Sequence, residues 1–280
     1  MSTIKRFESA PTQFQKVGNV RFAYRELGPR GGVPLIFLHH LTGVLDDWDP
    51  RVIDGIAAQR HVITFNNRGI GASGGSTPDT VEAMARDAIA FIRALGFEQV
   101  DLLGFSLGGM VAQVIVELEP QLVRKMILAG TGPAGGVGID KVTRITIIDV
   151  LKGYLTFKDP KQYLFFTTTA NGRRESANYM KRLKERTDDR DKKISLKAMG
   201  SQLRAIHAWG MQQPSDLSTI QQPIFVVNGD HDRMVPTPNT FDLAKRLPNS
   251  EIKIYPDAGH GGIFQFHNEF VAQALEFLAR

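Results

Sequence analysis

The sequence has 280 residues, of which 42% are hydrophobic and 22% are charged, and its formal net charge at pH 7 is +5. A chain of this length buries about three quarters of the surface that it exposes when unfolded, so we expect one large core. The composition is close to the average for globular proteins, which excludes collagen-like, disulfide-stapled and mostly disordered classes.

The positive charge is concentrated in one segment. Residues 171–197 contain ten Lys or Arg and five Asp or Glu, whereas the rest of the chain carries 24 of each kind. No aromatic or glycine pattern of a nucleic-acid-binding module accompanies this segment, so we expect a solvated helical face and no nucleic-acid partner.

The absence of cysteine and the length of the apolar runs indicate where in the cell the protein is expected. The chain has no cysteine, which excludes disulfides and a cysteine nucleophile and agrees with a cytoplasmic location. The apolar runs are far shorter than the ~20 residues that cross a bilayer, so no membrane partner is expected. Residues 1–15 lack the apolar region and cleavage site of a secretion signal, so we expect no export.

The first 130 residues alternate short β-branched runs with helical stretches, which predicts an α/β fold with a mostly parallel sheet covered on both faces. Residues 14–17 and 20–25 flank Gly18-Asn19, a pair typical of a tight hairpin turn. A helix is predicted over 78–95, with Thr77 as its N-cap and Gly96 as its stop. The buried strands are predicted at 34–38, 61–65, 100–103 and 125–129.

A different pattern follows residue 132. Residues 139–209 are charged, helical in pattern and poor in strand signal, and strands are predicted again only at 223–227 and 252–255, before a final helix over 268–280. The sequence therefore predicts a core domain of residues 1–132 and 216–280, interrupted by a helical cap insertion over 133–215.

The strongest chemical motif is Gly104-Phe105-Ser106-Leu107-Gly108. It directly follows a predicted strand and leads into a helix predicted over 109–118. A strand, sharp turn and helix in this order force strained backbone angles on the central residue and expose its hydroxyl. The N–H of Leu107 would lie at the positive end of the helix dipole, where it can stabilise an oxyanion.

Two weaker motifs overlap in a loop. Residues 71–75 repeat the Gly-x-Ser-x-Gly pattern around Ser73, and residues 69–74 match the Gly-x-Gly-x-x-Gly of dinucleotide sites. No strand leads directly into either, and no helix leaves them at once, so we expect a loop and no bound nucleotide.

A serine nucleophile requires a histidine base and a carboxylate that orients it. His260 lies in a glycine-rich loop between the last predicted strand and the last helix, which makes it the best candidate among seven histidines. Asp230 and Asp232 both follow the strand 223–227, and both satisfy the order serine, acid, histidine. Chain order alone leaves the choice between them open.

These motifs together resemble the α/β-hydrolase superfamily over residues 20–132 and 223–280. The resemblance implies that Asp232 is the acid, because Gly229, Asp232 and Pro236 match the usual acid loop of the family. It also implies a structural turn at 66–73, in which Asn66 replaces the usual aspartate.

The resemblance extends to the loop after the strand 34–38. His39-His40 stands where the family has His-Gly, and the N–H of Leu41 would be the second oxyanion donor. A histidine in place of glycine adds bulk and a titratable ring beside that loop. Adjacent strand residues point to opposite faces, so we expect no metal site at this pair. We also expect that the protein uses no cofactor.

The resemblance implies an enzyme that acts on a small acyl substrate. Haloalkane dehalogenases and epoxide hydrolases carry aspartate in place of Ser106, so these activities are excluded. Ester hydrolysis through an acyl-enzyme is the leading hypothesis. A cofactor-free haloperoxidase with the same triad is the alternative, although Leu41-Thr42 departs from the aromatic-proline pair typical of those enzymes. A non-catalytic small-molecule receptor on the same fold is the third.

The substrate pocket is expected between the sheet and the cap. Five cap aromatics are candidates for its lining, with the alternative that they form the cap's own small core. They are Phe157, Tyr163, Phe165, Phe166 and Trp209.

Overall fold

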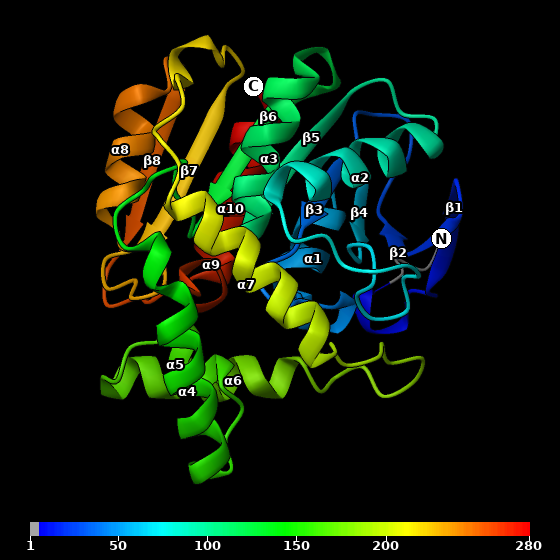
Figure 1. Cartoon of the computed structure of the whole chain (residues 1–280). Coiled ribbons are helices and arrows are strands. Elements are labelled where there is room, and N and C mark those ends of the chain that lie inside the picture. Colours follow the sequence, from blue (N-terminus) through cyan, green and yellow to red (C-terminus); the bar gives the residue numbers. More distant parts are fainter. Residues whose placement is uncertain (1–5) are drawn as a thin grey trace.

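The computed structural model describes residues 6–280, in which a twisted sheet lies between two layers of helices (Figure 1). Within these residues the sheet has eight strands in the order β1-β2-β4-β3-β5-β6-β7-β8. The strands are β1 (Gln13–Val17), β2 (Val20–Leu27), β3 (Leu35–Leu38), β4 (Val62–Phe65), β5 (Val100–Phe105), β6 (Val123–Ala129), β7 (Ile224–Gly229) and β8 (Ser250–Tyr255).

The strand directions confirm the predicted α/β architecture. β1 pairs with β2, and β2 with β4, in antiparallel fashion, whereas the other neighbouring strands are parallel. The predicted hairpin turns between Val17 and Val20, which pair with each other, and Gly18 adopts a φ of 57° there. Every residue of β3, β4, β5 and β7 is buried, as expected of strands that are covered on both faces.

Each face of the sheet has its own helices and its own hydrophobic cluster. α2 (Val81–Ala94), α3 (Leu107–Leu118) and α8 (Pro238–Arg246) contribute to one cluster. α1 (Pro50–Ala57), the short α9 (Gly262–Gln265) and α10 (His267–Ala279) contribute to the other. The carboxyl ends of the central parallel strands are therefore held in fixed positions between two packed layers.

Two helix starts differ from the prediction. α2 begins at Val81, and Thr80 is its N-cap, with its hydroxyl accepting a hydrogen bond from Ala83 N at 3.2 Å. The predicted cap Thr77 and start at Pro78 are therefore wrong by three residues, because Thr80 supplies the same capping chemistry closer to the apolar face. α3 begins at Leu107, two residues earlier than predicted.

The helices between β6 and β7 are α4 (Val142–Thr156), α5 (Lys161–Phe165), α6 (Ala170–Arg182) and α7 (Leu196–Gly210). In Figure 1 the first three project from the lower end of the molecule, and α7 leads back up towards β7. The cap meets the core at Phe165, whose carbonyl accepts a hydrogen bond from Gly261 N at 2.8 Å. The division into a core of 1–132 and 216–280 and a cap of 133–215 stays a prediction.

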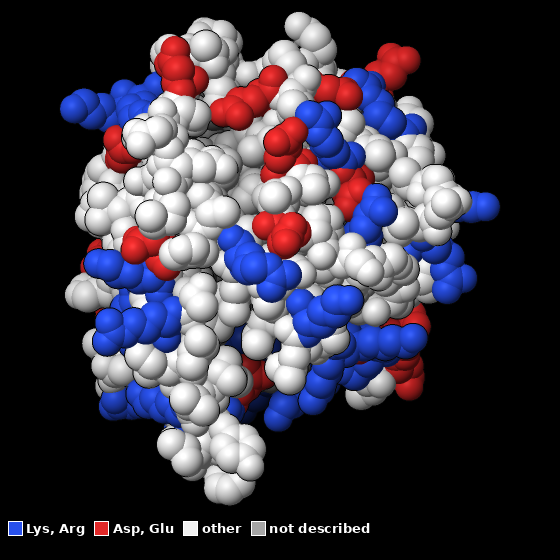
Figure 2. Space-filling model, in the orientation of Figure 1, with Lys and Arg blue, Asp and Glu red and all other residues white. Residues whose placement is uncertain are grey.

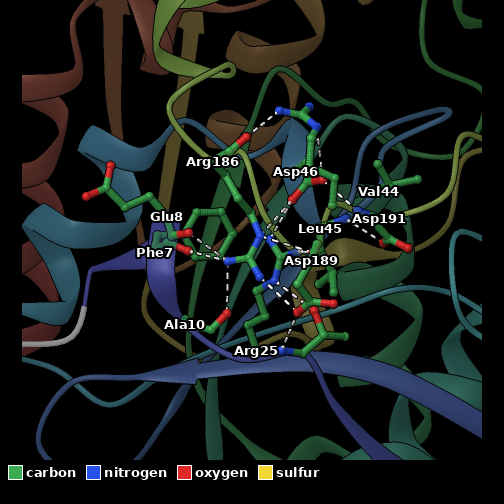
Figure 3. Close-up of polar contacts among 12 residues, drawn as sticks. Phe7, Glu8, Ala10, Arg25, Val44, Leu45, Asp46, Arg186, Asp189 and Asp191 are labelled. Atoms are coloured by element: carbon green, nitrogen blue, oxygen red, sulfur yellow. Dashed lines mark hydrogen bonds and ion pairs between the residues drawn. The ribbon is translucent and has the colours of Figure 1, made fainter.

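A buried ionic network attaches the linker between α6 and α7 to the core (Figure 3). Arg25 on β2 is fully buried and donates to Asp46 Oδ1 at 2.7 Å and to the carbonyl of Asp189 at 3.2 Å. Asp46 Oδ2 accepts from Asp191 N at 2.7 Å. Arg186 donates to three carbonyls near the N-terminus, those of Phe7, Glu8 and Ala10.

Among residues 6–280 no helix is both long enough and apolar enough to cross a membrane. Of the segment 1–15, in which the sequence predicts no secretion signal, residues 1–5 lie outside the described part of the chain.

Candidate active site

Ser106 stands at the junction of β5 and α3 with strained backbone angles, φ 56° and ψ −117°. A non-glycine residue rarely adopts a positive φ, and such strain persists only where the surrounding structure enforces it. Ser106 N donates to Ala129 O at 2.9 Å, and the Thr131 hydroxyl donates to Ser106 O at 2.8 Å. Ala129 is the last residue of the neighbouring strand β6 and Thr131 follows it two residues later, so the end of that strand holds the serine backbone.

Two glycines make this turn sterically feasible. A Cβ on Gly104 would lie 2.4 Å from Gly108 O, and a Cβ on Gly108 would lie 2.0 Å from Leu38 O at the end of β3. Neither backbone oxygen can move without disturbing the strand or the helix that carries it. The predicted need for glycine at both positions therefore has a direct steric cause.

His260 is held by Asp232 across 28 residues of sequence. His260 Nδ1 lies 2.7 Å from Asp232 Oδ2, and both side chains are almost fully buried. The other carboxylate oxygen, Oδ1, accepts from Met234 N at 2.7 Å and from Val235 N at 3.0 Å. Because the carboxylate can only accept, Nδ1 carries the proton in this arrangement, and Nε2 is the nitrogen that can act as a base.

Asp230 has other partners. Its carboxylate accepts from Asp257 N at 3.0 Å and from Ala258 N at 3.1 Å, and it lies 2.6 Å from Nδ1 of the exposed His231. Burial raises its pKa, but the hydrogen bonds from His231 and from the two amides lower the pKa by more. Asp230 thus stabilises the loop that carries His260, whereas Asp232 contacts the histidine itself.

Ser106 and His260 line the same cavity, which has a volume of about 560 Å³. The ring of Phe105 packs against that of His260 with centroids 4.9 Å apart, so the residue before the serine also positions the histidine. Within residues 6–280 no hydrogen bond links Ser106 Oγ to His260, a geometry that is common before a substrate binds. The cavity volume lies in the usual range for small-molecule sites.

The two amides expected to face an oxyanion are unused within residues 6–280. Neither Leu41 N nor Leu107 N has an acceptor there. The adjacent Thr42 adopts a φ of 65°, and its N–H donates to Gln202 Oε1 on α7 at 2.8 Å. α7 thus stabilises the strained loop that presents Leu41, through a contact that no sequence motif indicates.

His40 is part of the cavity wall and is uncharged. Its Nδ1 donates to Leu41 O at 2.7 Å, and its ring packs edge-on against Phe105 and Phe165. Burial lowers the pKa of His40 to about 4 and that of His39 to about 3. The extra bulk at position 40 is therefore accommodated by aromatic packing, and it adds no charge near Ser106 at neutral pH.

The sequence did not predict the cluster of charged side chains at one end of the cavity. Lys161 Nζ on α5 lies 3.1 Å from Asp47 and 3.3 Å from Asp159, and all three side chains line the cavity. Burial lowers the pKa of Lys161, but the two carboxylates raise it by more. Asp47 precedes the first core helix and Lys161 is in the cap, so no motif connects them in the sequence.

The aromatic lining was predicted only in part. Phe165 lines the cavity and contacts the His260 ring, with centroids 5.7 Å apart. Phe157 is exposed, and Phe166 and Trp209 are buried within the two main hydrophobic clusters. The expectation is therefore wrong for these three, and Tyr163 is also outside the lining. Apolar content alone did not distinguish lining residues from core residues.

His39 and His40 have separate surroundings, since the His39 ring packs at a tilt against Trp48 and His40 contacts Phe105. In the described part of the chain, no group of three or more His, Asp or Glu side chains is arranged to hold a metal ion.

Asn66 joins the core to the linker between α6 and α7. Its amide nitrogen donates to Asp191 Oδ2, and its oxygen accepts from Leu45 N at 3.0 Å. An aspartate at position 66 would place two carboxylates in contact, so the amide fits the acid that the linker brings here. Ser73, at the centre of the second Gly-x-Ser-x-Gly match, lies in a loop and donates to Asn66 O.

Comparisons with known proteins identify the fold family of the chain. A family model described as alpha/beta hydrolase fold matches residues 33–266. An alpha/beta hydrolase fold protein from Chitinophaga pinensis is 40% identical, with a TM-score of 0.93, over 98% of this chain and 99% of that one. A non-heme chloroperoxidase from Streptomyces lividans is 27% identical over 247 residues, which are 85% of this chain and 88% of the relative.

A thermophilic esterase from Thermogutta terrifontis shares the fold, with 19% identity and a TM-score of 0.73 over 96% of this chain and 98% of that one. The chain is thus similar to enzymes of more than one activity that share one architecture. With the family model covering most of its length, the chain belongs to the alpha/beta hydrolase fold family.

Proposed function

We propose that this protein is a serine hydrolase that cleaves a small carboxylic ester or a related acyl compound, with Ser106 as nucleophile, His260 as base and Asp232 as orienting acid. The observation that carries the proposal is the 2.7 Å contact between His260 Nδ1 and Asp232 beside a strained serine on the wall of the same cavity. No other described serine combines these three features.

The proposed reaction has two halves. His260 Nε2 takes the hydroxyl proton as Ser106 Oγ bonds to the acyl carbon, and the proton then passes to the leaving alkoxide as the ester bond breaks. Water adds to the acyl-enzyme in the same way, with its proton going to His260 and then to Ser106 Oγ as the carboxylic acid leaves. Asp232 stays ionised and stabilises the imidazolium in both halves.

The negative charge on the substrate oxygen would be stabilised by the N–H groups of Leu41 and Leu107. Leu107 is the first residue of α3, where the helix dipole favours negative charge. Loss of one such donor typically costs about 10²–10³ in kcat. The neutral state of His40 supports this assignment, because a neutral ring does not compete with these amides for the oxyanion.

A perhydrolase or chloroperoxidase activity is the second candidate, and the 27% identity to a non-heme chloroperoxidase favours it. In this reaction, hydrogen peroxide replaces water in the second half and releases a peracid, which then oxidises halide in solution. Acetate-dependent bromination with peroxide and hydrolysis of p-nitrophenyl acetate, measured on the same preparation, separate the two. Bromination far faster than hydrolysis would reverse the ranking.

The experiment that tests the main proposal is the substitution Ser106→Ala, assayed with p-nitrophenyl esters of graded acyl length. We expect kcat to fall by about 10³–10⁶ with the fold retained. Ser73→Ala is the matched control from the second Gly-x-Ser-x-Gly match, and it should retain most of the activity of each folded molecule. Wild-type protein that binds ligands but turns over no ester would instead indicate a receptor.

A further inference from the structure

The outer surface of α4 is the main feature that the proposed reaction does not use. Leu151, Tyr154 and Leu155 expose 58%, 81% and 76% of their surface, and Phe157 just beyond the helix exposes 98%. Ile147 and Ile148 continue this stripe towards the start of the helix. Their spacing of three and four residues places them on one side of α4.

The apolar side of this helix faces away from its own protein. The buried residues of α4 are Val142, Thr146, Asp149 and Gly153, and they include only one large apolar side chain. Asp149 is bound there by Arg233. A surface helix normally directs its apolar stripe at the core, so the reversed pattern indicates that another surface covers the stripe.

A groove lies beside the first half of the stripe. It has a volume of about 960 Å³, and its walls come from the start of α4 and from α7. Ile147, Ile148 and Leu203 form its apolar surface. Asp140, Arg144 and Arg204 are among its polar lining residues. Each molecule therefore carries an open apolar groove next to a projecting apolar helix end.

We propose that a second copy of this chain covers the stripe, with the two α4 helices antiparallel about a two-fold axis. In this arrangement the second half of α4 in each copy fills the groove beside the first half of α4 in the other. A two-fold contact requires one surface to be complementary to itself, and a groove followed by a projection on one helix satisfies this requirement.

One alignment of the two α4 helices also pairs charged and aromatic side chains across the contact. When Ile147 lies opposite Leu151 of the other copy, the same alignment places Arg144 opposite Tyr154. It also brings Asp140, just before α4, towards Lys158, just after α4 of the other copy. The first of these pairs allows a cation–π contact and the second an ion pair. Antiparallel helices also align their dipoles favourably.

The size of the surface is adequate for a dimer. Aromatic side chains bury about 150–250 Å² each, so Tyr154, Phe157 and four aliphatic residues offer several hundred Å² per copy. A stable interface takes about 800 Å² per partner, and the groove walls on α7 add to the helix. Figure 2 shows the projecting lower end of the molecule as uncharged, with Lys and Arg above it.

A lipid surface is the other occupant that such a patch suggests, and the groove argues against it. Amphipathic helices lie in the plane of a bilayer interface and bury their apolar face by about 5–10 Å. Here part of the apolar surface, formed by Ile147, Ile148 and Leu203, lines a groove between α4 and α7. A projecting helix end fills such a groove, whereas a flat lipid surface covers only its rim.

The proposed contact reaches the active site through α4. Thr146 and Val150 on this helix line the cavity that holds Ser106. A dimer would therefore stabilise one wall of the substrate cavity, and its dissociation should raise KM more than it lowers kcat.

The test is the mass of the full-length protein in solution, measured by sedimentation equilibrium over a range of concentrations. We expect a dimer at micromolar concentration, with twice the monomer mass of 31.0 kDa. Leu151→Glu and Leu155→Glu should each raise the dissociation constant roughly tenfold or more. Both side chains are exposed in the monomer, so these variants should fold. Phe241→Glu, at an exposed phenylalanine on α8, is the matched control and should leave the dimer intact.

The register is tested by charge reversal. Lys158→Glu should weaken the dimer, and the double variant Asp140→Lys with Lys158→Glu should restore it. A wild-type protein that stays monomeric at 100 µM would overturn the proposal, as would a dimer unaffected by both glutamate substitutions. Monomeric protein that sediments with anionic phospholipid vesicles would show that lipid, not a second copy, covers the stripe.

Discussion

His260 Nδ1 contacts Asp232 Oδ2 at 2.7 Å, while Asp230, two residues earlier in the same loop, turns its carboxylate to the amides of Asp257 and Ala258. The two acids that chain order could not separate therefore have different tasks in the folded protein. One orients the histidine ring, and the other shapes the loop that carries it.

This difference predicts kinetic effects of very different size for two similar substitutions. Asp232→Asn removes the charge that stabilises the imidazolium and permits the wrong tautomer, so kcat should fall by about 10⁴, as in serine proteases. Asp230→Asn should lower the free energy of unfolding but reduce kcat of the folded fraction less than tenfold. The measurement is kcat for p-nitrophenyl acetate beside a urea unfolding curve for each variant. Equal losses of kcat would contradict the assignment.

Acid should destabilise the protein through its buried histidines. Burial lowers the pKa of His39 to about 3 and of His40 to about 4, whereas an unfolded imidazole has a pKa of about 6.5. Between these values the unfolded state binds more protons, so the free energy of unfolding decreases as the pH falls. We expect a loss of roughly 2 kcal/mol or more per histidine between about pH 7 and pH 4.

Urea unfolding at a series of pH values measures this loss. His39→Leu should make the pH dependence shallower over that range, because it removes one of the two groups. His231→Gln is the matched control, since His231 is exposed and its pKa is raised by Asp230. An unchanged slope in the His39 variant would show that protonation of this buried histidine does not cause the destabilisation.

The serine turn should tolerate no side chain at Gly108. A Cβ there would lie 2.0 Å from Leu38 O, so Gly108→Ala must displace α3 from β3. We expect a loss of more than about 3 kcal/mol of unfolding free energy, in the range of severe overpacking. Gly32→Ala meets nothing within 4 Å and serves as the control, with a change below about 1 kcal/mol. Thermal and urea unfolding compare the two variants.

The buried ion pair of Arg25 and Asp46 should be essential for holding the linker between α6 and α7. Asp46→Asn leaves the fully buried Arg25 guanidinium without its charge partner, which typically costs about 3–5 kcal/mol. Arg30→Gln, which breaks an exposed pair with Glu26, should cost less than about 1 kcal/mol. Limited proteolysis should cleave the Asp46 variant first within residues 183–195. If the Asp46→Asn variant resists cleavage in this segment as well as the wild-type protein does, this role is contradicted.

The sequence predicted the sheet, the hairpin and the serine turn because each depends on local chemistry. The turn at Ser106 follows from the steric need for glycine at positions 104 and 108. The hairpin follows from the turn preference of Gly18. The start of α2 was misplaced because Thr77 and Thr80 both suit an N-cap, and only packing of Val81 and Met84 on the core selects between them.

The cap could not be predicted in the same way. Lys161 approaches Asp47 from more than a hundred residues away, and Asp191 reaches Asn66 from the linker between α6 and α7. These contacts depend on how separate helices are placed, and no periodicity encodes that. For the same reason Phe165, which lines the cavity, could not be told from its neighbour Phe166, which is buried in the core.

Labelling with a fluorophosphonate, followed by mass spectrometry of the digested protein, tests the proposed nucleophile most directly. We expect one phosphonyl adduct, on the peptide that contains Ser106, together with loss of esterase activity in proportion to labelling and no adduct in Ser106→Ala. An adduct on another serine, or full esterase activity in protein whose Ser106 is completely labelled, would contradict the assignment of Ser106 as nucleophile.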